Sequence, residues 1–187
     1  MKTEEQYFQE GITLQQYMSQ MSKLQEESFN VYENFQLPND SLVEELKGQS
    51  LHFLIITEDW CGDAMMINPI IRHLAEAADI EARVVMRDDD PNLIDRHLTN
   101  GGRAIPIVLI INDEGVLVGK WGPRAPEVQQ LVDDYRDSFP PKDDPNFETK
   151  QKEMIKILTK RYSEDSTLWN YVYDSIKVTL HNISIKK

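Results

Sequence analysis

The single cysteine of this chain, Cys61, is the residue best placed to do covalent chemistry. It follows an apolar run with β-branched residues, Leu51 to Ile56, and precedes a stretch from Ala64 to Ala78 whose apolar residues recur at helical spacing. A thiol at the start of a helix lies near unpaired backbone N–H groups, which favour the nucleophilic thiolate. The sequence therefore predicts a reactive thiol at a strand-to-helix junction.

The chain has no second cysteine with which Cys61 could form an internal disulfide. Ala64 occupies the position three residues later, where a dithiol motif carries its second cysteine. A dithiol resolves its own mixed disulfide with the advantage of high effective molarity, whereas a single thiol must be released by an external thiol. The chemistry open to Cys61 is therefore exchange with a mixed disulfide, or covalent capture of a substrate.

Three carboxylates lie close to Cys61 in the sequence: Glu58, Asp59 and Asp63. Each disfavours a thiolate and opposes the effect of the helix start, which is worth ~1 kcal/mol. Two interpretations of Cys61 follow, an activated nucleophile or a vestigial thiol on an inherited fold. For Asp63, its position at a helix start favours a capping role over acid–base chemistry.

The elements around Cys61 alternate between strands and helices. Strands are predicted at residues 51–56, 82–86, 105–111 and 116–121, and helices at 64–78, 92–98 and 125–139. The order β-α-β-α-β-β-α predicts an α/β fold with a mixed sheet that has helices on both faces.

Further helices are predicted on either side of this core. They span residue 14 to about 35, opened by a capping box at Thr13, then 42–47 with Ser41 as the cap, 147–162 and 168–180. We therefore divide the chain into an N-terminal helical extension packed on the core (1–47), the core (48–139) and a C-terminal helical extension (140–187). The pattern at 183–185 is consistent with a short strand or a frayed end.

Composition excludes several classes of function. A net charge of −12 argues against binding to nucleic acid or to an anionic membrane surface, because phosphate contacts need Lys and Arg. No run approaches the ~20 apolar residues of a membrane span, and no apolar signal segment is visible at the start. With one cysteine and four scattered histidines, we expect a cytoplasmic protein without a metal site.

Four segments of the core carry motifs of one known family: Trp60-Cys61-Gly62, Pro69, Gly102 to Pro106 and Trp121-Gly122. With them the core resembles the thioredoxin family. The first segment matches the start of the family's Trp-Cys-Gly-Pro-Cys motif, and Pro69 matches the proline of its active-site helix. The third matches the cis-proline segment, and Trp121-Gly122 matches the rim after the hairpin. The resemblance covers about residues 48–139. It implies a thioredoxin-like mixed sheet flanked by helices, with extra N- and C-terminal helices.

Three departures from the family pattern concern the redox apparatus. The motif proline is Asp63 here, the resolving cysteine is Ala64, and the family's buried acid corresponds to Ile55. The chain therefore resembles single-cysteine relatives of thioredoxin.

The resemblance implies a site in which Cys61 is the nucleophile and Ile105 and Pro106 dock an extended substrate by backbone pairing. The same site has its surface shaped by Trp60, Gly62 and Asp63. Our leading hypothesis is a monothiol thiol-disulfide oxidoreductase that acts on protein or low-molecular-weight mixed disulfides and is recycled by an external thiol. The alternative is a non-catalytic binding module that keeps the thioredoxin groove. We expect a monomer without a cofactor; a cluster shared between two copies, as in monothiol glutaredoxins, stays open in principle.

Overall fold

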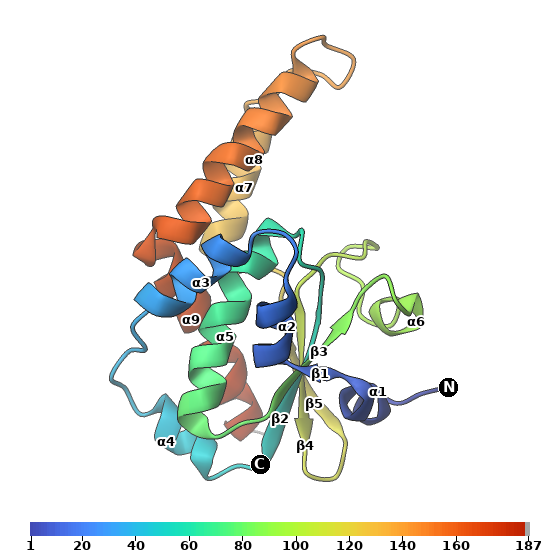
Figure 1. Ribbon diagram of the computed structural model, residues 1–187, viewed down its shortest axis with the longest axis vertical. Helices are drawn as coiled ribbons and strands as arrows, with labels where there is room; N and C mark the ends of the chain where they lie inside the picture. Colours follow the sequence, from blue (N-terminus) through green and yellow to red (C-terminus); the bar gives the residue numbers. More distant parts are fainter. Residues whose placement is uncertain (186–187) are drawn as a thin grey trace.

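A mixed sheet forms the centre of the computed structural model, which describes the backbone of residues 1–185 and side chains as far as Ile183. Within this part of the chain the sheet has five strands in the order β1-β3-β2-β4-β5 (Figure 1). The strands are β1 (Ile12–Thr13), β2 (Leu51–Thr57), β3 (Ala82–Met86), β4 (Ile107–Asn112) and β5 (Leu117–Trp121). Only the β2–β3 pair is parallel. The predicted mixed sheet is confirmed, with strand ends within two residues of those expected.

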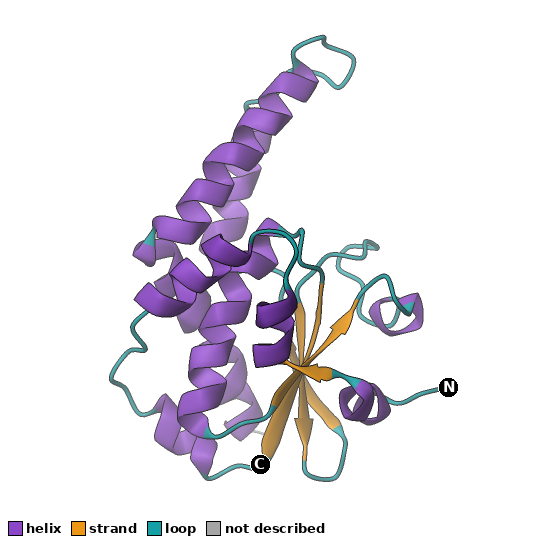
Figure 2. Ribbon diagram, viewed as in Figure 1, coloured by secondary structure: helices purple, strands orange, loops and turns teal. Residues whose placement is uncertain are grey.

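Helices cover both faces of the sheet. They are α1 (Glu4–Glu10), α2 (Leu14–Gln20), α3 (Gln25–Asn34), α4 (Leu42–Lys47), α5 (Gly62–Ala78), α6 (Pro91–Ile94), α7 (Pro126–Asp137), α8 (Phe147–Glu164) and α9 (Ser166–Ile185). Figure 2 shows the sheet edge-on, with α1 and α6 on one side and the other helices on the opposite side. The predicted α/β class is thereby confirmed.

The central strand β2 supplies side chains to both hydrophobic cores. Phe53 and Ile55 pack in the larger core with α5, whereas Leu54 and Ile56 pack in the smaller core with α1 and α6. Successive strand residues point to opposite faces, so burial on both sides requires an unbroken apolar run. Cys61 belongs to the smaller core, and its side chain therefore faces the α1 and α6 side.

The N-terminal region differs from the predicted pattern. Helix α1 and strand β1 were not predicted, although a capping box at Thr3 opens α1 just as the predicted one at Thr13 opens α2. The single helix expected from residue 14 to about 35 is two helices, because Leu24 adopts a left-handed conformation with φ 58°. Ser41 occupies the predicted N-cap position of α4, but its side chain forms no capping hydrogen bond. The carboxylate of Asp40 accepts the N–H of Leu42 instead, at 3.0 Å.

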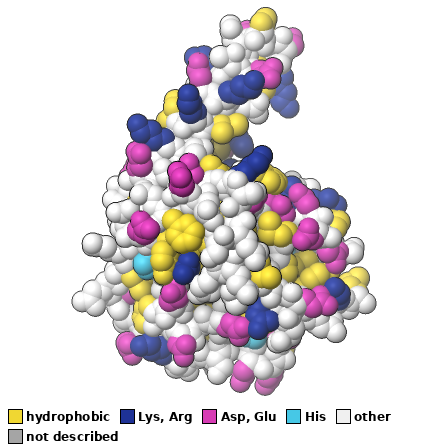
Figure 3. Space-filling model, viewed as in Figure 1, with side chains coloured by type: hydrophobic (Ala, Val, Ile, Leu, Met, Phe, Trp, Pro, Cys, Tyr) yellow, Lys and Arg dark blue, Asp and Glu magenta, His cyan; other side chains and the backbone are white. Residues whose placement is uncertain are grey.

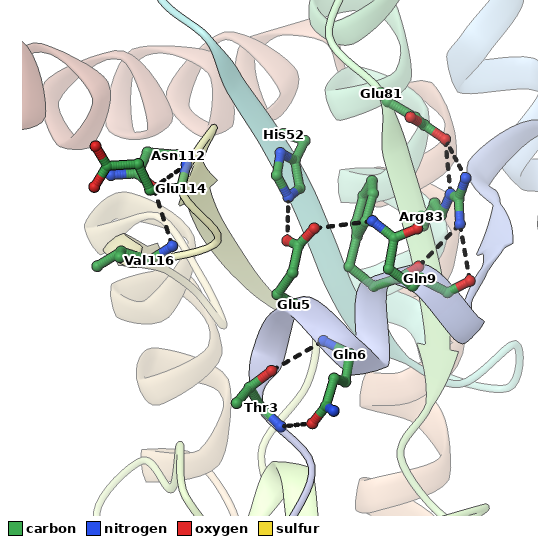
Figure 4. A network of polar contacts seen from close by, with 11 residues as sticks. Thr3, Glu5, Gln6, Gln9, His52, Glu81, Arg83, Asn112, Glu114 and Val116 are labelled. Atoms are coloured by element: carbon green, nitrogen blue, oxygen red, sulfur yellow. Dashed lines mark hydrogen bonds and ion pairs between the residues drawn. The ribbon is translucent and has the colours of Figure 1, made fainter.

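Polar contacts fix α1 against the sheet, as Figure 4 shows. Glu5 lies 2.6 Å from the ring nitrogen of His52 on β2. Arg83 on β3 donates to the backbone carbonyls of Phe8 and Gln9 at the end of α1. These contacts assign His52 a structural role and give the first residues of the chain a defined place on the smaller core.

The C-terminal helices pack on the same core as the N-terminal ones. Both α8 and α9 contact α5, as do α3 and α4. The N-terminal end of α8 projects away from the sheet (Figure 1). Ile183, for which a short strand or a frayed end was considered, lies in α9 and packs on β5, where a Cβ at Gly119 would come within 2.4 Å of its side chain. The three-part division of the chain remains a prediction.

The loop before β4 and the loop after β5 meet at Gly122. This glycine has φ +124°, and a Cβ added to it would lie 2.3 Å from the carbonyl oxygen of Pro106. Both the backbone conformation and the close approach therefore require glycine. The contact holds the Pro106 loop at the end of the sheet where α5 begins.

We expect Gly122→Ala to reduce the free energy of unfolding by about 2–4 kcal/mol, because the new methyl group displaces the Pro106 loop. Gly101→Ala is the matched control: Gly101 also has positive φ, but a Cβ there meets nothing within 4 Å. The control should cost only about 1–2 kcal/mol. Urea unfolding followed by circular dichroism measures both, and equal losses would contradict the role given to the close approach.

Candidate functional site

Cys61 occupies the N-cap position of α5, directly after the turn that follows β2. Its side chain is only 8% exposed. The thiol donates a hydrogen bond to the backbone carbonyl of Ile105, with 3.6 Å between sulfur and oxygen. The sulfur therefore lies where the sequence analysis expects it, between the start of α5 and the Ile105–Pro106 segment.

Burial and charge together keep this thiol protonated at neutral pH. Burial raises the pKa of Cys61 to about 11, and the negative charge of Asp63 acts in the same direction. The backbone N–H groups of Ala64 and Asp63 and the positive charge of Arg124 act to lower this pKa but do not compensate. The helix-start effect is present, yet the loss of hydration outweighs it.

The other two carboxylates near Cys61 in sequence have partners of their own. Glu58 accepts the backbone N–H of Asp88 at 3.2 Å, and its partial burial raises its pKa. Asp59 accepts both the N–H and the hydroxyl of Ser22 at 2.8 Å, and these bonds lower its pKa. Sequence proximity alone therefore overstated their influence on the thiol.

Asp63 does not cap α5, contrary to the prediction. Its carboxylate forms a two-point ion pair with the guanidinium of Arg124, at 3.0 Å and 2.8 Å. Arg124 also donates to Gln129, and both members of the pair are mostly buried. Arg124 could not be recognised from sequence patterns, because it lies 61 positions from Asp63 and no local motif links the two.

The start of α5 is covered by α8, a helix assigned to the C-terminal extension. A Cβ added at Gly62 would lie 3.8 Å from the ring of Tyr162. Tyr162 is buried, and its burial and the charge of Asp63 raise its pKa well above the usual range. The candidate site thus includes a residue 101 positions from Cys61 in the sequence, which core motifs cannot reveal.

On the other side of the sulfur lie Ile105 and Pro106, both buried and joined by a cis peptide bond. Trp60 is 47% exposed at the rim of the site. The guanidinium of Arg87 lies 5.0 Å from the centre of its ring, within the range of a cation–π contact. Trp60 is thus held as an exposed, oriented surface beside Cys61.

The other three histidines each contact a carboxylate or a backbone carbonyl. His97 lies against Glu4, His181 against Glu45, and His73 against the backbone carbonyl of Tyr32. Among residues 1–185, no three His, Cys, Asp or Glu side chains are grouped to hold a metal ion. In the same range no helix is long and apolar enough to cross a membrane.

Comparison with known proteins identifies the family. A family model described as Thioredoxin matches residues 11–136. The chain belongs to the thioredoxin family. The match begins before β1 and includes α2, α3 and α4 of this thioredoxin-family protein, so it extends beyond residues 48–139, on which the resemblance rested.

Solved structures share the fold of this thioredoxin-family protein. A protein of unknown function from Pseudomonas aeruginosa, PA1234, is 16% identical with a TM-score of 0.63, over 87% of this chain and 96% of that one. An HIV epitope-scaffold is also 16% identical, with a TM-score of 0.67, over 97% and 99% of the two chains. A search of curated proteins finds no match. At this identity the likeness shows the fold alone.

We expect Asp63→Asn to lower the pKa of Cys61 below the wild-type value of about 11, because a nearby negative charge is removed while Arg124 stays. Since only the thiolate is alkylated, the rate of reaction with iodoacetamide at pH 8 should rise about tenfold. The rate is measured from pH 7 up to the highest pH at which the protein stays folded.

Glu114→Gln is the control for this measurement, because it removes the same charge from the exposed turn before β5. It should leave the alkylation profile of Cys61 unchanged. A Cys61 pKa that is unchanged or raised in Asp63→Asn would contradict the electrostatic role assigned to this carboxylate.

Proposed function

We propose that this thioredoxin-family protein exchanges its single thiol, Cys61, with mixed disulfides carried by proteins or small thiols. The observation that supports this most directly is the hydrogen bond from the Cys61 thiol to the Ile105 carbonyl. It puts the sulfur beside the backbone segment that would dock an extended substrate.

This hydrogen bond also links docking to reactivity. A bond donated by the thiol stabilises its protonated form. A substrate that pairs its backbone with Ile105 donates an N–H to the same carbonyl and competes with the thiol for it. Docking would therefore remove one of the contacts that keep Cys61 protonated, so the resting thiol is unreactive and the docked complex is more reactive.

The exchange itself balances with one thiol on the protein. The Cys61 thiolate attacks one sulfur of the substrate disulfide, forms a new disulfide to it and expels the other half as a thiolate. An external thiol then attacks this mixed disulfide, releases the Cys61 thiolate and carries away the bound half as a new disulfide. The protein ends as it began, and the external thiol is the group oxidised.

A second candidate function is binding without chemistry, and the burial of Cys61 favours it. The thiol is 8% exposed with a pKa raised to about 11, Ala64 replaces the resolving cysteine, and Ile55 is fully buried where the family has an acid. In this case the groove beside Trp60 recognises a partner and the sulfur is only part of the core.

The exchange hypothesis predicts a specific dependence on one backbone N–H of the substrate. We would use a short peptide whose single cysteine carries a small thiol, and N-methylate one backbone nitrogen at a time at the cysteine and its two neighbours. Of the three methylated peptides, one should react with Cys61 about tenfold more slowly than the unmethylated peptide, since it loses one hydrogen bond of ~1.4 kcal/mol to Ile105. The other two should react at the unmethylated rate. Release of the small thiol is followed by absorbance.

Two controls make this result interpretable. Exchange of each peptide with dithiothreitol in the absence of protein corrects for its intrinsic reactivity, and Cys61→Ser should give neither release nor a covalent adduct by intact mass. Equal rates for all peptides would overturn docking at Ile105. Absence of any exchange, with partner binding kept in Cys61→Ser, would favour the binding module.

A further inference from the structure

Two neighbouring hollows are lined by α8, and one of them reaches the start of α5. One, of about 480 Å³, extends to Trp60 and Gly62, and the other, of about 590 Å³, lies between α8 and Glu27 of α3. The two hollows adjoin along Ile155 and Thr159 of α8, and we call them together the α8 groove.

The charge of the α8 groove is opposite to that of the molecule. Its lining has six basic and three acidic side chains, whereas the whole chain carries a net charge of −12. Asp63 and Arg124, one acid and one base of this lining, neutralise each other, which leaves five basic and two acidic side chains. Figure 3 shows Lys and Arg side chains along the projecting part of the molecule that contains α8.

Three lysines form a row along the groove. Lys152, Lys156 and Lys160 recur every four residues, so they lie on one side of α8 and span about 12 Å. Lys156 and Lys160 are exposed and form no ion pair with any described residue. Lys152 has only a weak exposed pair with Glu148, at 3.5 Å. This row is therefore free to contact negative charges on another molecule.

Apolar side chains accompany this row. Ile155, shared by both hollows, is 56% exposed, and Trp60 at the other end of the groove is 47% exposed. Exposed apolar side chains next to unpaired cations are suited to a ligand that carries both carboxylates and apolar groups.

We propose that the α8 groove binds an acidic peptide segment with apolar side chains, contributed by a partner protein. The cations are spread over more than two helical turns, which suits an extended chain better than a small anion. The large negative charge of the rest of the molecule repels a nucleic acid, whose phosphates extend far beyond the groove, more than it repels a short acidic segment. The proposal goes beyond the exchange reaction, because no contact in it requires the Cys61 sulfur.

The test measures binding of a fluorescein-labelled 12-residue peptide, made of glutamates with two leucines, by fluorescence anisotropy at low salt. All proteins carry Cys61→Ser, so that failure of binding is distinct from failure of exchange. The double variant Lys156→Gln/Lys160→Gln should bind about tenfold more weakly, since two exposed charge contacts are lost. Affinity should also fall as salt is added.

Lys47→Gln/Lys120→Gln is the matched control, because both lysines are exposed and lie outside the groove. It should keep wild-type affinity, and a peptide with glutamines in place of the glutamates should bind far more weakly. Equal weakening by both double variants, or no binding to wild type, would overturn the proposal. So would preferential binding of a single-stranded oligonucleotide, or a dimer in light scattering that Lys156→Gln/Lys160→Gln dissociates.

Discussion

The ion pair between Asp63 and Arg124 connects the parts of the molecule that form the candidate site. Asp63 lies in the first turn of α5, and Arg124 lies between β5 and α7, so the pair links the start of α5 to the end of the sheet. Tyr162 of α8 packs over the same pair. Because both charged groups are largely removed from water, removing either one alone would leave an uncompensated charge, at a cost of roughly 3–5 kcal/mol.

The state of Cys61 follows from a competition between two effects of different size. A helix start stabilises a thiolate by ~1 kcal/mol. The pKa raised to about 11 corresponds to roughly 3 kcal/mol of added preference for the protonated form, relative to a thiol in water. Burial therefore determines the protonation state of Cys61, and the charge of Asp63 raises its pKa further. The reactivity of Cys61 is thus determined more by the loop that covers its sulfur and by the neighbouring Asp63–Arg124 ion pair than by its position at the start of α5.

The sequence predicted those parts of the fold that rest on local patterns. Continuous apolar runs rich in β-branched residues predicted the central strands, and the thiol was correctly located at the start of α5. The pattern failed where the deciding partner is distant in sequence: Asp63 was assigned a cap because Arg124 is not a neighbour, and Tyr162 was not considered. It also failed for β1, since two residues are too short to show alternation, and at Leu24, where a left-handed backbone interrupts an otherwise helical apolar pattern.

The shortness of β1 has a consequence for how the molecule behaves among other chains. A sheet edge with a long row of free N–H and C=O groups can pair with a strand of another molecule and start aggregation. Here β3 is paired on its outer side by only two residues, Ile12 and Thr13, and the chain turns into α1 before them and α2 after them. The edge that β1 forms is therefore too short to template a further strand, and the N-terminal helices protect the sheet as well as enlarge its cores.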